Sequence, residues 1–169
     1  MRIVVRVFVI MVLSLLMLFY SPLTEPKSAA TLVKYIDEGD LNEVTLEIYE
    51  NPWDCSIIPM NSKDLVKSVV AEQDYSEYKT VVKGEMLAEK SFEITKLADF
   101  ALADLKNSKG KCHGHVLSYC AFKNKLGKTI FDFSMPYFDS DDNPKILVNG
   151  TYIDYVDYYE EFLKLFANG

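Results

Sequence analysis

The stretch that decides the fold is HVLSYCAFKNKLGKTIFDFS, residues 115–134. Its first part is rich in aromatic and β-branched or other apolar residues, which is typical of a long strand. Asn124-Lys125-Leu126-Gly127 then provides a polar, glycine-containing turn. The remainder alternates between two faces, with Phe131 and Phe133 on one side and Asp132 on the other. The stretch therefore predicts an antiparallel β-hairpin.

Other segments also have the features of strands. Residues 44–49 alternate apolar and polar side chains, as a half-buried strand does, and the pattern stops at Asn51-Pro52. Residues 80–83 predict another short strand. Residues 145–153 predict a second hairpin around Asn149-Gly150, because Asn-Gly is the strongest two-residue hairpin signal.

Helical patterns separate and follow these strands. The clearest begins after Ser91, a good N-cap, and its apolar residues recur at helical spacing as far as Leu105. Shorter helices are expected over residues 32–36 and 63–72, and an aromatic-rich one over residues 154–166. We therefore expect an α+β fold: an antiparallel sheet of about five strands with helices packed on one face, preceded by an N-terminal signal or anchor segment.

Residues 1–30 have the order of an export signal: a basic start, an apolar run from Val7 to Tyr20, and Ser28-Ala29-Ala30 before a cleavage position. The run is shorter than the ~20 residues that cross a bilayer comfortably, which favours cleavage. Including the residues before it gives enough length for a thin or tilted span, so an uncleaved anchor is the alternative. We expect residues 31–169 to form a single exported domain, and residues 21–30 to have no packing role.

The composition narrows the range of partners. The formal net charge is -7 and the sequence has no clustered basic run, which argues against a nucleic acid or an anionic membrane as the main partner. Contact with the membrane is expected only through the N-terminal segment, if it stays uncleaved. The 11 Tyr and 10 Phe residues favour a firm core over a disordered tail. No cofactor is expected.

Three cysteines, Cys55, Cys112 and Cys120, are an odd number for an oxidising compartment. One disulfide with one remaining thiol would allow three pairings. The other interpretation is that all three are free and buried as small apolar residues. The spacing does not choose between these, because a disulfide depends on the distance between α-carbons in the fold.

Cys112, His113, His115 and Cys120 form the densest set of soft metal ligands, and thiolate and imidazole suit zinc or copper. Their spacing does not match a zinc finger or ribbon. The alternative is a glycine-containing turn that enters a strand, with Cys120 in the core and both histidines solvated. Cys112 next to His113 is also a candidate nucleophile, since a thiol enzyme needs a base beside its cysteine.

Aromatic residues give the candidate binding surface. Tyr155, Tyr158 and Tyr159 on the last expected helix combine a large contact area with a hydrogen-bonding tip. At helical spacing they are also compatible with a place in the core or at its rim. Trp53, next to Asn51-Pro52, is either a loop anchor in the core or an exposed hot spot.

Four segments resemble an uncharacterised family of small exported domains of Gram-positive bacteria: LNEVTLEIY at 41–49, IIPM at 57–60, KTIFDFSM at 128–135 and ILVNG at 146–150. In that family a signal precedes one α+β domain of unknown function. The resemblance implies this organisation, and it implies no activity and no functional residues.

The sequence therefore predicts an exported non-enzymatic binding domain that acts outside the cell or at the outer face of its membrane. Its ligand would be another protein or a cell-envelope component, bound through one face of the sheet or through the Trp53 loop. A small extracytoplasmic metal-binding protein is the alternative. A thiol-dependent hydrolase is the second alternative.

Overall fold

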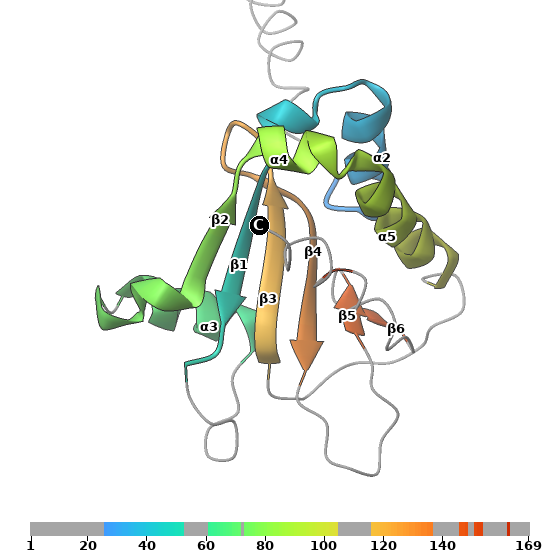
Figure 1. Cartoon of the computed structure of the whole chain (residues 1–169). Helices are drawn as coiled ribbons and strands as arrows, with labels where there is room; N and C mark the ends of the chain where they lie inside the picture. The colour runs from blue at the N-terminus through green and yellow to red at the C-terminus, as the bar shows by residue number, and fades with distance from the viewer. Residues whose placement is uncertain are drawn as a thin grey trace, which may run out of the picture.

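The structure is a computed structural model, and it describes residues 26–52, 61–71, 73–104, 116–136, 146–148, 151–153 and 162 (Figure 1). The helices lie between and before the first strands, and the last four strands follow one another. In order they are α2 (Ala29–Asp37), η2 (Leu41–Glu43), β1 (Thr45–Glu50), α3 (Ser62–Ala71), η3 (Gln73–Tyr78), β2 (Lys79–Val82), α4 (Gly84–Glu89), α5 (Ser91–Asp104), β3 (Val116–Lys123), β4 (Thr129–Pro136), β5 (Ile146–Val148) and β6 (Thr151–Ile153).

The described strands form one sheet of six strands in the order β2-β1-β3-β4-β5-β6, and every neighbouring pair is antiparallel. The expected α+β class with an antiparallel sheet is confirmed, with six strands where about five were expected. β3 and β4 form the hairpin predicted from residues 115–134. β5 and β6 pair as the second predicted hairpin.

The turn between β3 and β4 depends on Asn124 and Gly127. The side-chain oxygen Oδ1 of Asn124 accepts hydrogen bonds from the backbone N–H groups of Leu126 and Lys128, both at 3.1 Å. Gly127 has a φ angle of 73°, a backbone conformation that residues other than glycine rarely adopt. The polar turn in the sequence therefore has a definite structure.

The main core lies between one face of the sheet and the helices α2 and α5. Strand alternation directs the apolar residues of β1, β3, β4 and β5 to this face. Its fully enclosed members include Leu32, Leu46, Ile94, Ala98, Phe122, Phe131, Phe133, Val148 and Phe162. Phe162 is the one described residue of the expected last helix, and it is buried in this core.

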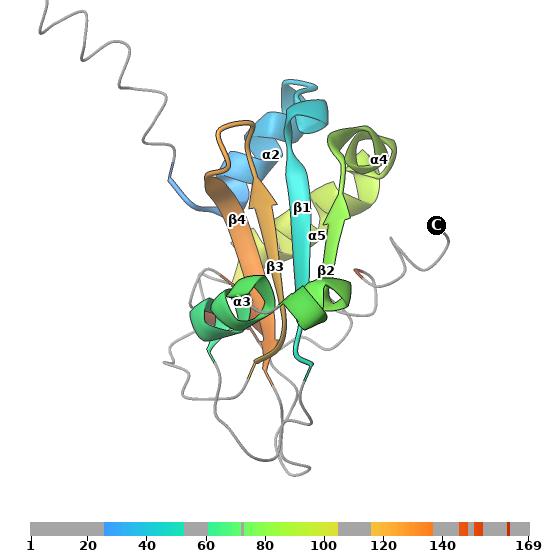
Figure 2. The ribbon, with the colours of Figure 1, turned by 90° about the vertical axis from the view of Figure 1, so that its left-hand side faces the viewer.

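The expectation that all helices pack on one face is wrong. Figure 2 shows α3 in front of the sheet, with α2 and α5 behind it. Leu65 and Val69 of α3 are buried against Tyr49 and Val116 in a second, smaller core. The second face of the sheet has apolar and aromatic side chains near one end, and α3 packs on them and shields them from water.

Two helices differ from the predicted elements. α4 follows β2 directly, in a segment for which the sequence predicted no helix. α2 begins at Ala29 instead of residue 32, and Ala29 is completely buried. Residues 26–30 therefore do pack against the domain, contrary to expectation. Within the described ranges, no helix is both long enough and apolar enough to cross a membrane.

Candidate functional site

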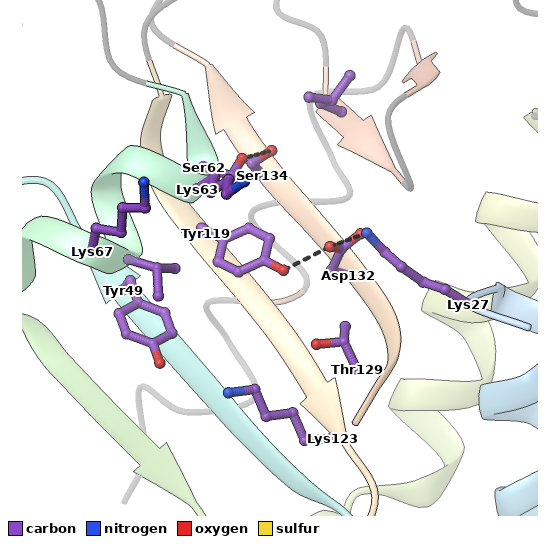
Figure 3. A pocket seen from close by; sticks show the side chains of 12 residues that line it. Lys27, Tyr49, Ser62, Lys63, Lys67, Tyr119, Lys123, Thr129, Asp132 and Ser134 are labelled. Carbon is purple, nitrogen blue, oxygen red and sulfur yellow. Dashed lines mark hydrogen bonds and ion pairs between the residues drawn. The ribbon is translucent and has the colours of Figure 1, made fainter. Parts of the chain in front are cut away.

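A pocket of about 500 Å³ lies between α3 and the second face of the sheet (Figure 3). α3 forms one wall, β1, β3, β4 and β5 form the floor, and the segment before α2 contributes one residue to the rim. The residues that line it are Lys27, Tyr49, Ser62, Lys63, Val66, Lys67, Tyr119, Lys123, Thr129, Asp132, Ser134 and Leu147. Its size is in the range of small-ligand sites in proteins.

The register of the sheet explains why polar groups meet on this floor. Tyr119 of β3 is paired with Tyr49 of β1 on one side and with Ser134 of β4 on the other. Ala121 of β3 is likewise paired with Asp132. Because side chains two residues apart share a face, these residues all lie on the face opposite the main core. The small side chain of Ala121 leaves this part of the floor without a bulky group.

Asp132 is the buried acid of the pocket. It is 5% exposed, the Tyr119 hydroxyl donates a hydrogen bond to its Oδ2 at 2.7 Å, and Lys27 forms an ion pair with it. Figure 3 shows Tyr119 and Lys27 approaching it from opposite sides. Burial and the charge of Asp132 raise the pKa of Tyr119. The phenol therefore stays protonated and acts as a hydrogen-bond donor.

A second acid, Glu47, lies half-buried on the same face beside the pocket. It forms ion pairs with Lys79, at 3.0 Å, and with Lys123, and it accepts a hydrogen bond from the Tyr49 hydroxyl at 2.5 Å. Burial by itself would raise the pKa of Glu47, but the hydrogen bonds from Lys123, Tyr49 and Lys79 outweigh it and lower the pKa to about 2. Glu47 thus holds Lys123 and Tyr49 in place at the pocket.

Replacing Glu47 with glutamine is expected to lower the free energy of unfolding at neutral pH by about 1–2 kcal/mol, because two lysines lose their charged partner. Because the pKa of Glu47 is lower in the folded state than its ordinary value of 4.5, its ionised form stabilises the fold at pH values above about 4.5. This stabilisation is lost as the pH falls towards 2. The difference between wild type and Glu47→Gln should therefore shrink as the pH falls from about 4.5 to about 2. Urea unfolding across this range measures it.

Glu43→Gln is the matched control, because it removes an exposed ion pair with Lys125. This variant should be within about 0.5 kcal/mol of wild type at neutral pH and should keep the acid-dependent loss. An equal stability difference for Glu47→Gln at pH 7 and pH 2.5 would contradict the role given to Glu47.

Most of the residues predicted to form a site lie outside the described part of the chain. This holds for Trp53 and for the three tyrosines of the last expected helix, Tyr155, Tyr158 and Tyr159. It also holds for three of the four soft metal ligands, which are Cys112, His113 and His115. The described residues contain no group of three or more His, Cys, Asp or Glu side chains that could hold a metal ion.

Cys120 is the one predicted ligand that the structure describes. It is a free thiol, 2% exposed, in the main core, on the face of the sheet opposite the pocket. Burial, followed by the charges of Glu50 and Asp132, raises its pKa. Cys120 therefore behaves as a small apolar residue, which is the alternative interpretation of that position.

The pocket residues were not singled out from the sequence, although part of the signal was present. The alternation in β1 directs Glu47 and Tyr49 away from the main core, and Lys63 and Lys67 are four residues apart on α3. Nothing in the sequence shows that α3 lies over this face, so the two patterns could not be connected.

Comparisons with protein-family models, with curated proteins and with solved structures found no significant match to this chain. The resemblance to exported domains of Gram-positive bacteria stays a prediction. The class that fold and pocket define is an α+β domain with a polar, lysine-lined pocket on one face of its antiparallel sheet.

Proposed function

We propose that this protein is an exported, non-enzymatic binding domain, and that the pocket between α3 and the sheet takes a ligand with a carboxylate or phosphate group. The observation that carries the proposal is the charge of the pocket. Four of the lining residues are lysines and one is a carboxylate, in a protein with a formal net charge of -7. Lysines concentrated at one place in an otherwise acidic protein favour the binding of an anion there.

Two of the four lysines are available to a ligand. Lys27 is paired with Asp132, and Lys123 is paired with Glu47. Lys63 and Lys67, one helical turn apart, form no ion pair within the described part of the chain. Ammonium groups at this spacing can reach the same anionic group from one wall of the pocket.

The rest of the lining favours a ligand that also has an apolar or ring-shaped part. Tyr49 and Tyr119 present their rings on the floor with centroids 6.2 Å apart, and Val66 and Leu147 add apolar surface. The hydroxyl of Ser62 lies 3.1 Å from that of Ser134, which joins α3 to β4 at one end of the pocket. Aromatic surface beside a few polar groups is the common composition of small-ligand sites.

The hydrogen bonds within the pocket also support binding. Tyr119 is held protonated and already donates to Asp132. The Ser62 hydroxyl meets another hydroxyl instead of a basic group. An activated nucleophile requires an adjacent base or a lowered pKa. The described side chains are therefore better suited to holding a ligand than to attacking one.

Phenyl phosphate is a suitable probe, because it joins an anionic group to a ring. We expect it to shift the NMR signals of Tyr119 and Ser134 in the wild-type protein. The double variant Lys63→Gln/Lys67→Gln should weaken its binding by about tenfold or more, since two charge-assisted contacts are lost. Titrations at low and high salt measure both effects.

Lys125→Gln is the matched control, because Lys125 lies in the turn between β3 and β4 and does not line the pocket. It removes one positive charge and should leave the affinity for phenyl phosphate within about twofold. If Lys125→Gln weakened binding as much as Lys63→Gln or Lys67→Gln alone, the affinity would depend only on the net charge of the protein. In that case the pocket would not be the binding site.

A further inference from the structure

The residues just before α2 fill a gap beside β4. β5 pairs with β4 only at Phe133 and Ser134, so the first half of β4 has no strand on that side among the described residues. The backbone N–H of Ser28 donates a hydrogen bond to the carbonyl of Ile130 at 2.8 Å in this gap. Figure 2 shows the segment before α2 beside β4. The segment therefore satisfies a carbonyl that the sheet leaves open.

The same residues begin α2. The side chain of Ser28 is the N-cap and accepts a hydrogen bond from the backbone N–H of Thr31 at 3.2 Å. The hydroxyl of Thr31 donates to the carbonyl of Pro26 at 2.6 Å. Ala29 and Leu32 are both completely buried in the main core. Capping, hydrogen bonding and burial all reach back to Pro26.

Lys27 extends this role to the pocket. Its ammonium group forms the ion pair with the buried Asp132 and lines the rim. A buried carboxylate that loses its cationic partner is costly, because its charge is then poorly compensated. The segment before α2 thus supports both the core and the candidate site.

From these contacts we infer that residues 26–30 belong to the folded domain, and that any export cleavage lies before Pro26 instead of after Ala30. A cut after Ala30 would remove the cap of α2, the buried Ala29, the hydrogen bond to Ile130 and the ion pair between Lys27 and Asp132 together. A cut before Pro26, or an uncleaved leader, keeps all four. This inference does not depend on what the pocket binds.

The first test is the N-terminus of the full chain, expressed with a C-terminal tag and recovered from the membrane and medium fractions. Intact mass and N-terminal sequencing should give a chain that starts at or before Pro26, or the uncleaved chain. A folded product that starts at any residue from 27 to 31 would overturn the inference.

The second test compares Ala29→Asp with Ala30→Asp in the full chain. Both add one carboxylate to the first turn of α2, where a negative charge is otherwise favourable. Ala29 is completely buried and Ala30 is exposed, so Ala29→Asp should lower the melting temperature by roughly 5 °C or more, and Ala30→Asp by less than about 2 °C. Equal melting temperatures would show that this segment is not part of the fold.

Discussion

Replacing Gly84 with alanine is expected to lower the free energy of unfolding by about 3 kcal/mol. Gly84 is the first residue of α4, and it packs directly against the backbone of η2. A Cβ atom at this position would lie 2.3 Å from the carbonyl oxygen of Asn42 and 2.5 Å from its carbonyl carbon. Because both are backbone atoms, neither can rotate away, and one of the two segments must move.

The sign of this effect is informative. In a helix without such a neighbour, glycine to alanine stabilises by up to about 1 kcal/mol, because alanine has the higher helix propensity. Urea unfolding of Gly84→Ala therefore reports on the contact between α4 and η2. A variant as stable as wild type would mean that the two segments are not in close contact.

Gly39→Ala serves as the control. Gly39 has φ 76°, and a Cβ there would meet no atom within 4 Å. Its expected cost of about 1 kcal/mol comes only from the left-handed backbone conformation. A larger loss for Gly84→Ala than for Gly39→Ala separates a steric clash from backbone strain.

The second large effect is expected for Phe133→Ala, at about 3–5 kcal/mol. Phe133 is 2% exposed, and β4 places it between Cys120 of β3 and Val148 of β5. Its ring meets that of Phe162 edge to face with centroids 4.8 Å apart. Truncation therefore removes apolar contacts in the main core and leaves a cavity that the sheet cannot close.

Two further variants make this prediction specific. Phe133→Leu keeps much of the volume and should cost about 1–2 kcal/mol. Phe92→Ala removes the same ring from a residue that is 68% exposed, where its contact is with Lys96 at 4.6 Å from the centroid. It should cost no more than about 1 kcal/mol. Similar midpoints of urea unfolding for Phe92→Ala and Phe133→Ala would contradict the assignment of Phe133 to the core.

The sequence predicted the strands well because strand alternation is a local property. The β3–β4 hairpin, the end of β1 before Asn51-Pro52 and the β5–β6 pair all follow from patterns of neighbouring residues. Helix α5 follows from its N-terminal Ser91 and its apolar spacing. The short α4 was missed because its start depends on a contact with Asn42, far away in the sequence.

The candidate site could be predicted only in fragments. Glu47, Tyr119 and Asp132 are on different strands, and each has its polar side chain where alternation places it. What makes them a site is that Lys27 reaches Asp132 from before α2 and that α3 closes one wall. These contacts join segments up to about a hundred residues apart, and no local pattern encodes them.

By itself, then, the sequence determined the α+β class, the strand pairing within each hairpin and the apolar face of the sheet, because side-chain periodicity and turn chemistry act over a few residues. The tertiary structure decided the strand order, the place of α3 on the second face, the inclusion of residues 26–30 in the fold and the burial of Asp132 in a lysine-lined pocket. These features depend on which segments, far apart in the sequence, pack against each other and exclude water between them.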